Sequence, residues 1–334
     1  MGNLLLNEYN IDFNALKNKT ILITGASGLI GLHLLSSIKK KQKELNIKIY
    51  TWNKTPNNML SDIFSGCNTI YEDITEINNL DFLPNFDYII HSSGYGQPNK
   101  FLDNKIKTIE INTSVTLRLL NKLKPNGTFL FISSSEVYNG LFEYNITEDR
   151  IGLTNPTHPR SPYIEGKRCG ESICNIFREN GKNVKVVRLG ITYGPGTQKG
   201  DTRVINSLID KGLNNDIIEL LDDGSSLRSF CYITDAVEMI WNILFTGKEF
   251  VYNVASTNSM SILELSNIVG GILNKKIKTP KTNNGLVGNP ILVNLSIDRY
   301  LNEFDKKYFV SVEEGIKNTI DWQINLNKLV NEKN

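Results

Sequence analysis

Short apolar runs alternate with longer amphipathic stretches along the first part of the chain. The runs are rich in β-branched residues and bounded by glycine or polar residues, which is typical of buried strands. We predict six such strands, at residues 20–24, 47–52, 69–74, 86–91, 127–132 and 184–189. Between them, apolar residues recur at helical spacing, most clearly over residues 29–38, 104–123 and 161–179. This alternation predicts an α/β fold with a doubly wound parallel sheet of the Rossmann type.

The pattern becomes irregular after Gly194-Pro195-Gly196. There we predict a helix over residues 201–212, a strand over 229–233, a helix from about residue 235 and short helices over 256–325. We therefore divide the chain into three parts. They are an N-terminal extension at 1–18, a dinucleotide-binding domain at 19–190 to which 229–256 returns, and a smaller, irregular substrate-binding lobe at 191–228 and 257–334.

Composition and charge exclude several classes of function. The 334-residue chain carries a formal net charge of +2, which gives no reason to expect a nucleic-acid partner. Its four cysteines lack C-x-x-C spacing and it has three histidines, so we expect free thiols and no metal site. No apolar run approaches the ~20 residues that span a bilayer, and the N-terminus lacks a secretory signal. We expect a cytoplasmic protein without membrane contact.

A glycine-rich turn joins the first predicted strand to the first predicted helix, with the spacing G-x-x-G-x-x-G. Such a turn lets the backbone approach a pyrophosphate, and the N–H groups and dipole of the following helix favour its negative charge. We therefore predict a dinucleotide site at Gly25, Ser27, Gly28, Leu29, Ile30 and Gly31.

The ends of the next strands supply the remaining predicted cofactor contacts, at Asn53, Asp73, Ile74, Ser92, Ser93 and Gly94. The acidic residue that usually binds the adenosine ribose is missing, and Trp52, Asn53 and Lys54 stand in its place. NAD is the expected cofactor, and Lys54 leaves NADP open. His91 is expected to line the same edge of the sheet.

Tyr163 and Lys167 stand four residues apart in the predicted helix 161–179, so their side chains share one face. An ammonium held near a phenol favours the phenolate and lowers its pKa. Taken alone, this pattern most often marks a solvated helix face. Beside a dinucleotide site, we interpret the pair as catalytic and as cofactor contacts. The polar cluster after strand 127–132 supplies three further catalytic candidates, Ser134, Ser135 and Glu136.

With these motifs in place, the chain resembles the extended short-chain dehydrogenases/reductases of the nucleotide-sugar epimerase/dehydratase family, from Lys19 to about Trp322. Within that family it is most similar to the UDP-glucuronate decarboxylases (UDP-xylose synthases). The similar segments include Ser134-Ser135-Glu136-Val137-Tyr138, Pro159-Arg160-Ser161, Tyr163-x-Glu165-Gly166-Lys167-Arg168, Asp201-x-Arg203-Val204 and Arg228-Ser229-Phe230.

The resemblance implies NAD-dependent oxidation of a nucleotide sugar at C4. Tyr163 would take the C4 proton, Ser134 would bind the C4 oxygen, and Glu136 with Ser135 would act in the later step. It also implies that Arg203 and Arg228 bind the nucleotide diphosphate, whereas Arg160 is as readily explained by structural pairing. Substrate contacts are thus expected at Ser134, Glu136, Tyr163, Arg203 and Arg228.

Three departures from the decarboxylase pattern leave the reaction after C4 oxidation open. In one of them, Asn139 and not Gly directly follows Tyr138. Ile191 replaces an expected Asn, and the Arg-x-Pro expected beyond residue 285 is missing, with Asn289-Pro290 as its nearest remnant. Decarboxylation, 4-dehydrogenation, 4-epimerisation and 4,6-dehydration remain possible, and a catalytically silent dinucleotide-binding protein is a remote alternative. The resemblance further implies a homodimer whose four-helix interface uses residues 104–123 and 161–179 of each subunit.

Overall fold

The structure is a computed structural model that describes residues 9, 11–57, 60–198, 200–257, 259–280 and 288–331. Of the predicted N-terminal extension, residues 1–8 and 10 lie outside the described residues. Near its end, the short helix η2 (Asn14–Leu16) buries Leu16 in the main core.

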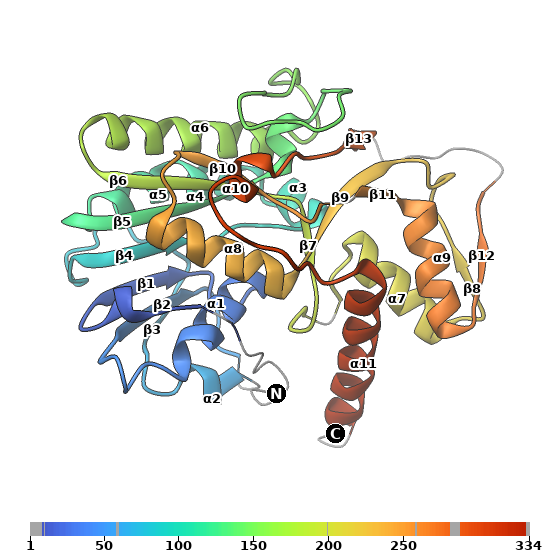
Figure 1. The fold of residues 1–334 in the computed structure, drawn as a ribbon, viewed down its shortest axis with the longest axis horizontal. Helices are drawn as coiled ribbons and strands as arrows, with labels where there is room; N and C mark the ends of the chain where they lie inside the picture. Colours follow the sequence, from blue (N-terminus) through green and yellow to red (C-terminus); the bar gives the residue numbers. More distant parts are fainter. Residues whose placement is uncertain are drawn as a thin grey trace.

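A seven-stranded sheet forms the centre of the structure, and all its strand pairs are parallel (Figure 1). Its strand order is β10-β6-β5-β4-β1-β2-β3, so the order reverses between β1 and β4. The strands are β1 (Thr20–Thr24), β2 (Lys48–Asn53), β3 (Asn68–Tyr71), β4 (Phe86–His91), β5 (Leu123–Ser134), β6 (Asn183–Leu189) and β10 (Val251–Val254). The predicted doubly wound α/β fold and its six strands are confirmed, with shifts of a few residues at the ends.

Helices cover both faces of this sheet, and successive side chains of each strand point to opposite faces. Ile21 and Ile23 join the core beneath α1 (Leu29–Lys39) and α8 (Ile233–Thr246). Leu22 joins the core on the opposite face, with side chains of three helices. These are α4 (Lys105–Asn112), α5 (Ser114–Leu120) and α6 (Ser161–Glu179). The short helices α2 (Ser61–Phe64) and α3 (Pro98–Asp103) complete this half.

Two predicted helices differ from the observed ones for local reasons. The helix predicted over 104–123 is interrupted at Thr113, whose hydroxyl donates to the Ile109 carbonyl, a bond that tends to bend helices. The helix predicted over 201–212 is α7 (Val204–Asn214). It starts later because the Asp201 carboxylate binds both the backbone N–H and the guanidinium of Arg203.

The second lobe is built from short strands and three longer helices. β7 (Ile191–Tyr193), β9 (Leu227–Tyr232), β11 (Ser259–Ser261) and β13 (Leu292–Val293) form one sheet, and β8 (Ile217–Glu219) pairs with β12 (Lys276–Lys278). The helices are α7, α9 (Ile262–Leu273) and α11 (Val312–Asn331). The segment 229–256, which was predicted to return to the first domain, is shared between the two parts of the structure. β9 belongs to the second-lobe sheet, whereas α8 and β10 pack on or join the central sheet.

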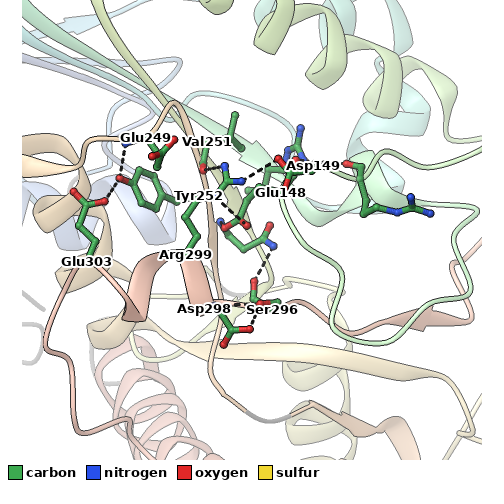
Figure 2. A network of polar contacts seen from close by, with 12 residues as sticks. Glu148, Asp149, Glu249, Val251, Tyr252, Ser296, Asp298, Arg299 and Glu303 are labelled. Atoms are coloured by element: carbon green, nitrogen blue, oxygen red, sulfur yellow. Dashed lines mark hydrogen bonds and ion pairs between the residues drawn. The ribbon is translucent and has the colours of Figure 1, made fainter.

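A polar network ties β10, the edge strand of the central sheet, to the segments around Glu148 and Ser296 (Figure 2). Glu148 accepts the backbone N–H of Asn253 at 2.8 Å and lies 3.4 Å from Arg299. Arg299, in α10 (Asp298–Leu301), donates to the Val251 carbonyl and to Asp149, each at 3.0 Å. Asn253 also donates to the Ser296 carbonyl at 2.9 Å. These contacts hold three segments that are distant in the sequence at the edge of the central sheet.

Candidate active site

Two adjoining cavities of about 380 and 360 Å³ follow the carboxyl ends of the central strands. They share Ile30, Ser92, Ser93, Gly94, Gly96 and Arg203, so they form one continuous crevice. The crevice lies where the strand order reverses between β1 and β4, the usual ligand position in open α/β sheets.

The glycine turn after β1 forms one wall of the second cavity. Gly25 has φ +67°, and a Cβ atom there would lie 2.8 Å from the Cα of Ser93. A Cβ on Gly31 would lie 2.8 Å from the Cα of Ala26 and closer still to the Gly25 carbonyl. Gly28 precedes α1 without a side-chain cap, which leaves first-turn N–H groups available for a ligand. This cradle fits the pyrophosphate of a dinucleotide.

Asn53, at the end of β2, adds a second observation that fits a dinucleotide. Its Oδ1 accepts the backbone N–H of Ser27 at 2.7 Å, whereas its buried Nδ2 has no partner among the described residues. Because Asn53 lines the cavity, a ligand oxygen can satisfy this donor. The same cavity brings together the predicted cofactor residues Gly25, Ser27, Gly28, Leu29, Ile30, Gly31, Asn53, Asp73, Ile74, Ser92, Ser93 and Gly94.

Asp73 lines the second cavity, near Asn53 and Lys54, and belongs to a charged cluster. Its carboxylate lies 2.7 Å from Lys107 and 2.9 Å from Lys54, and it accepts the Thr75 hydroxyl at 2.7 Å. Burial opposes its ionisation, but the bonds from Lys107, Lys54 and Thr75 outweigh burial and hold the pKa of Asp73 well below its usual range. Asp73 is therefore an ionised carboxylate shared by two lysines.

The first cavity holds all the predicted catalytic residues, namely Ser134, Ser135, Glu136, Tyr163 and Lys167. Tyr163 and Lys167 lie on α6, which begins at Ser161 with Pro162 in its first turn. The Ser134 hydroxyl, at the end of β5, lies close enough to the Tyr163 phenol to favour the phenolate and act to lower its pKa. Phe101 stacks on the Tyr163 ring with centroids 4.6 Å apart, and this contact holds the ring in place. Sequence reasoning missed Phe101, since one aromatic residue in a short helix gives no signal of its own.

Burial dominates the electrostatics of this pair. It lowers the pKa of Lys167 to about 7, partly opposed by Glu171, and the Lys167 Nζ donates to the Ile132 carbonyl at 2.7 Å. Burial also raises the pKa of Tyr163, although the nearby Ser134 acts in the other direction. The net shift of the Tyr163 pKa is therefore opposite to the one predicted from the Lys167 ammonium, because desolvating the phenolate costs more than nearby groups return.

The catalytic candidate Glu136 is a carboxylate paired with an arginine. Arg160 binds it through two nitrogens, Nε to Oε2 at 3.0 Å and Nη2 to Oε1, and Asn139 donates to it at 3.2 Å. The third guanidinium nitrogen, Nη1, donates to Asn289 at 3.0 Å. Structural pairing thus accounts for Arg160. Asn289, first considered only as a remnant of a missing motif, lines the cavity.

The two predicted diphosphate ligands differ in how their charges are balanced. Arg203 forms a bidentate pair with Asp201, with its closest contact at 2.7 Å. Arg228 contacts carbonyl oxygens of Leu227, Pro290 and Ile291, and no carboxylate pairs with it among the described residues. Burial lowers its pKa to about 10, so it stays a cation at neutral pH. Arg228 is therefore a buried positive charge that faces the cavity and favours an anionic ligand.

His91 does not line the crevice as expected. It is fully buried between the Thr24 hydroxyl at 2.8 Å and the Ile111 carbonyl at 2.9 Å, and burial lowers its pKa to about 3. His91 is a neutral structural residue at the end of β4. Among the described residues, there is no group of three or more His, Cys, Asp or Glu side chains that could hold a metal ion. No described helix is both long and apolar enough to cross a membrane.

Comparison with known proteins gives concordant results. Residues 21–255 match the sequence model of the NAD dependent epimerase/dehydratase family. UDP-glucuronic acid decarboxylase 6 from Arabidopsis thaliana is 28% identical over 271 residues, which are 80% of this chain and 78% of that protein. UDP-glucuronic acid decarboxylase 1 from Danio rerio is 28% identical over 258 residues, 76% of this chain and 61% of that protein.

Among solved structures, the fold is similar to that of UDP-glucuronic acid 4-epimerase from Bacillus cereus, determined in complex with UDP-glucuronic acid and NAD. The TM-score is 0.77 at 24% identity, over 92% of this chain and 99% of that one. The dTDP-glucose 4,6-dehydratase of Bacillus anthracis, in complex with NAD, also has a TM-score of 0.77, at 20% identity over 93% and 98% of the two chains. These two likenesses establish a shared fold.

Proposed function

The chain belongs to the NAD dependent epimerase/dehydratase family, and on this premise we propose that it is an NAD-dependent enzyme that oxidises a nucleotide sugar at C4. One observation carries the proposal. The residues Ser134, Tyr163 and Lys167 line the first cavity, which adjoins the dinucleotide cradle of the second cavity and is also lined by the buried cation Arg228. We assign the cofactor to the crevice beside the glycine turn, and the sugar to the cavity between the central sheet and the second lobe.

NAD, when bound, supplies a nicotinamide that accepts a hydride from the sugar carbon and can return it. The residues that would hold it are the glycine turn, Asn53, the Ser92–Gly94 segment and Lys167. The Lys167 Nζ is well placed for this, because a Cβ atom on Gly94 would lie 3.8 Å from it.

Tyr163 would remove the proton from the C4 hydroxyl, and Ser134 would hydrogen-bond the C4 oxygen as it becomes a carbonyl. Both side chains line the same cavity and lie close to each other, which supports this division of roles around one substrate oxygen. Lys167, when protonated, would favour the phenolate. Arg228, with Arg203 beside it, would bind the diphosphate by charge-assisted hydrogen bonds.

UDP-glucuronate is the first substrate to test, because the relatives named above are UDP-glucuronic acid decarboxylases. A ketone at C4 makes the C5 carboxylate that of a β-keto acid. The bond from C5 to the carboxylate carbon can then break with release of CO₂, and its electron pair enters the enolate of the ketone. Protonation at C5 and return of the hydride to C4 complete a redox-neutral cycle. Glu136, held by Arg160, and Ser135 both line this cavity and would supply or relay that proton.

A product assay tests the proposed function. The protein is incubated with NAD and a panel of nucleotide sugars, and CO₂, sugar mass and reduced cofactor are followed. Release of CO₂ from UDP-glucuronate supports decarboxylation. A persistent 4-keto sugar with stoichiometric reduced cofactor would identify a 4-dehydrogenase instead. Failure of every nucleotide sugar to react, in a protein that binds NAD, would contradict the proposal and favour a catalytically silent protein.

We also propose that the protein is a cytoplasmic homodimer. α4, α5 and α6 lie together on one face of the sheet (Figure 1) and expose apolar side chains there, at Ile106, Ile109, Leu117 and Ile176. A second copy packed on this face would cover them and form a four-helix interface. All four cysteines are unpaired, in keeping with a reducing compartment.

A further inference from the structure

The adenosine end of the crevice lacks the carboxylate with which this fold usually binds the ribose 2′-hydroxyl. Trp52, one residue before the end of β2, turns its indole into the core and donates to the Glu72 carbonyl at 3.0 Å. Asn53 lines the cavity instead, and its buried Nδ2 has no partner among the described residues. A carboxylate at this place would accept from a hydroxyl and repel a phosphate, whereas an amide N–H can donate to either.

Lys54 follows directly and also lines the cavity. Its side chain is 57% exposed and contacts Asp73 at 2.9 Å, so it is free to turn towards a ligand. Asp73 would not be left unpaired by that movement, because Lys107 at 2.7 Å and the backbone and hydroxyl of Thr75 still bind it. Lys54 can therefore bind a second anion at little cost to the cluster.

Other charged residues also line this cavity. Glu72, on the segment after β3, and Lys100, in α3, are both exposed. Asp201, also on the wall, is neutralised by its bidentate pair with Arg203. Lys54 is thus the exposed cation that directly follows Asn53, whose Nδ2 has no partner among the described residues.

We propose that the adenosine end of the crevice accepts a ribose 2′-phosphate as well as a 2′-hydroxyl, so that the protein binds NADP in addition to NAD, with Lys54 as the specificity-determining residue. The inference rests on the proposed function only in taking the crevice as a dinucleotide site. It extends that function to a second cofactor, chosen by residues where this chain departs from the usual pattern.

The test measures cofactor binding without any sugar, by calorimetric titration of protein freed of copurifying dinucleotide. We expect NADH and NADPH to bind with dissociation constants within about tenfold of each other. Lys54→Met should weaken NADPH binding by about tenfold and NADH binding by less than about twofold, because one charge-assisted contact to the phosphate is lost. Asn53→Asp should also weaken NADPH selectively, since its carboxylate can still accept from Ser27.

Lys41→Met is the matched control, because Lys41 is exposed and pairs with Glu44 away from the crevice. It should leave both affinities unchanged. Binding of NADH without NADPH would overturn the inference and leave the proposed function intact, as would an equal effect of Lys54→Met on both cofactors. Failure of both cofactors to bind would overturn the proposed function as well.

Discussion

Lys167 is the buried titratable side chain whose charge affects both the proposed chemistry and the stability of the fold. Its pKa falls from 10.5 to about 7 on burial, so between these values the unfolded chain binds more protons than the folded protein. Stability must then rise with pH across this interval, by up to ~1.4 kcal/mol per pH unit, and the benefit is lost as pH falls through about 7.

Comparison with Lys167→Met isolates this contribution. We predict that the unfolding free energy of the wild type, relative to the variant, increases by about 1–3 kcal/mol from about pH 7 to about pH 9. Urea unfolding at each pH measures it, and Lys43→Met, at an exposed position, controls for the loss of a lysine. Parallel pH profiles for wild type and Lys167→Met would show that Lys167 is not desolvated.

The Glu136–Arg160 pair lends itself to a second prediction, because the chain contains an exposed counterpart. The side chains of Arg160 and Glu136 are 7% and 16% exposed, whereas those of Arg150 and Glu143 are 52% and 43% exposed. Arg160→Met leaves a largely buried carboxylate unpaired and should cost about 3–5 kcal/mol of stability. Arg150→Met should cost less than about 1 kcal/mol. Similar small losses for both variants in urea unfolding would contradict the assignment of Arg160 as a structural partner of Glu136.

The sequence predicts which residues lie at the site better than it predicts their ion pairs and pKa values. Strand ends and helix spacing were sufficient to bring Ser134, Tyr163 and Lys167 to one cavity. They could not predict that Glu136 is held by Arg160, or that burial raises the Tyr163 pKa, because both depend on residues distant in the chain and on the depth of the cavity.

At the scale of elements, the contact between the glycine turn and α1 can be tested with two glycines in helices. A Cβ atom at Gly31 would meet the backbone of the preceding turn, whereas one at Gly271 in α9 would meet nothing within 4 Å. We predict that Gly31→Ala lowers stability by about 1–3 kcal/mol and weakens NADH binding by about tenfold or more, because the cradle must shift.

Gly271→Ala should instead raise stability by about 0.5–1 kcal/mol and leave NADH binding unchanged, since alanine favours the helix. Thermal unfolding and cofactor titration distinguish the two variants. Tight NADH binding by Gly31→Ala would mean that this turn does not form the cradle.

The elements themselves were predictable where local pattern decides them. Most strands of the central sheet are short and largely buried, and the pattern from Ser161 to about Glu179 predicted α6 closely. The second lobe was harder, because β7, β11 and β13 have two or three residues each and form only through pairing with β9. Such contacts between distant segments leave little periodicity in the sequence.

At the scale of the whole molecule, the proposed dimer predicts a change of mass. Ile106 is 74% exposed and Ile176 is 54% exposed, on two of the three helices of the proposed interface. A double variant, Ile106→Asp with Ile176→Asp, would place charges in the interface and should convert a particle of two chains into one of a single chain. Light scattering after size exclusion measures this. Tyr308→Asp, at a 65% exposed position in the second lobe, should remain dimeric. A wild type that is monomeric, or a double variant that stays dimeric, would contradict the proposed interface.

The central claim is that Tyr163 drives oxidation at sugar C4, and isotope transfer tests it most directly. The nucleotide sugar that reacts in the product assay is labelled with deuterium at C4 and mixed with protein and NAD. We predict that deuterium slows the reaction and passes between C4 and the cofactor. With Tyr163→Phe, transfer should fall by about 10²–10⁴-fold while NAD binding is retained. Turnover in which the label never leaves C4, or undiminished transfer in Tyr163→Phe, would contradict the account.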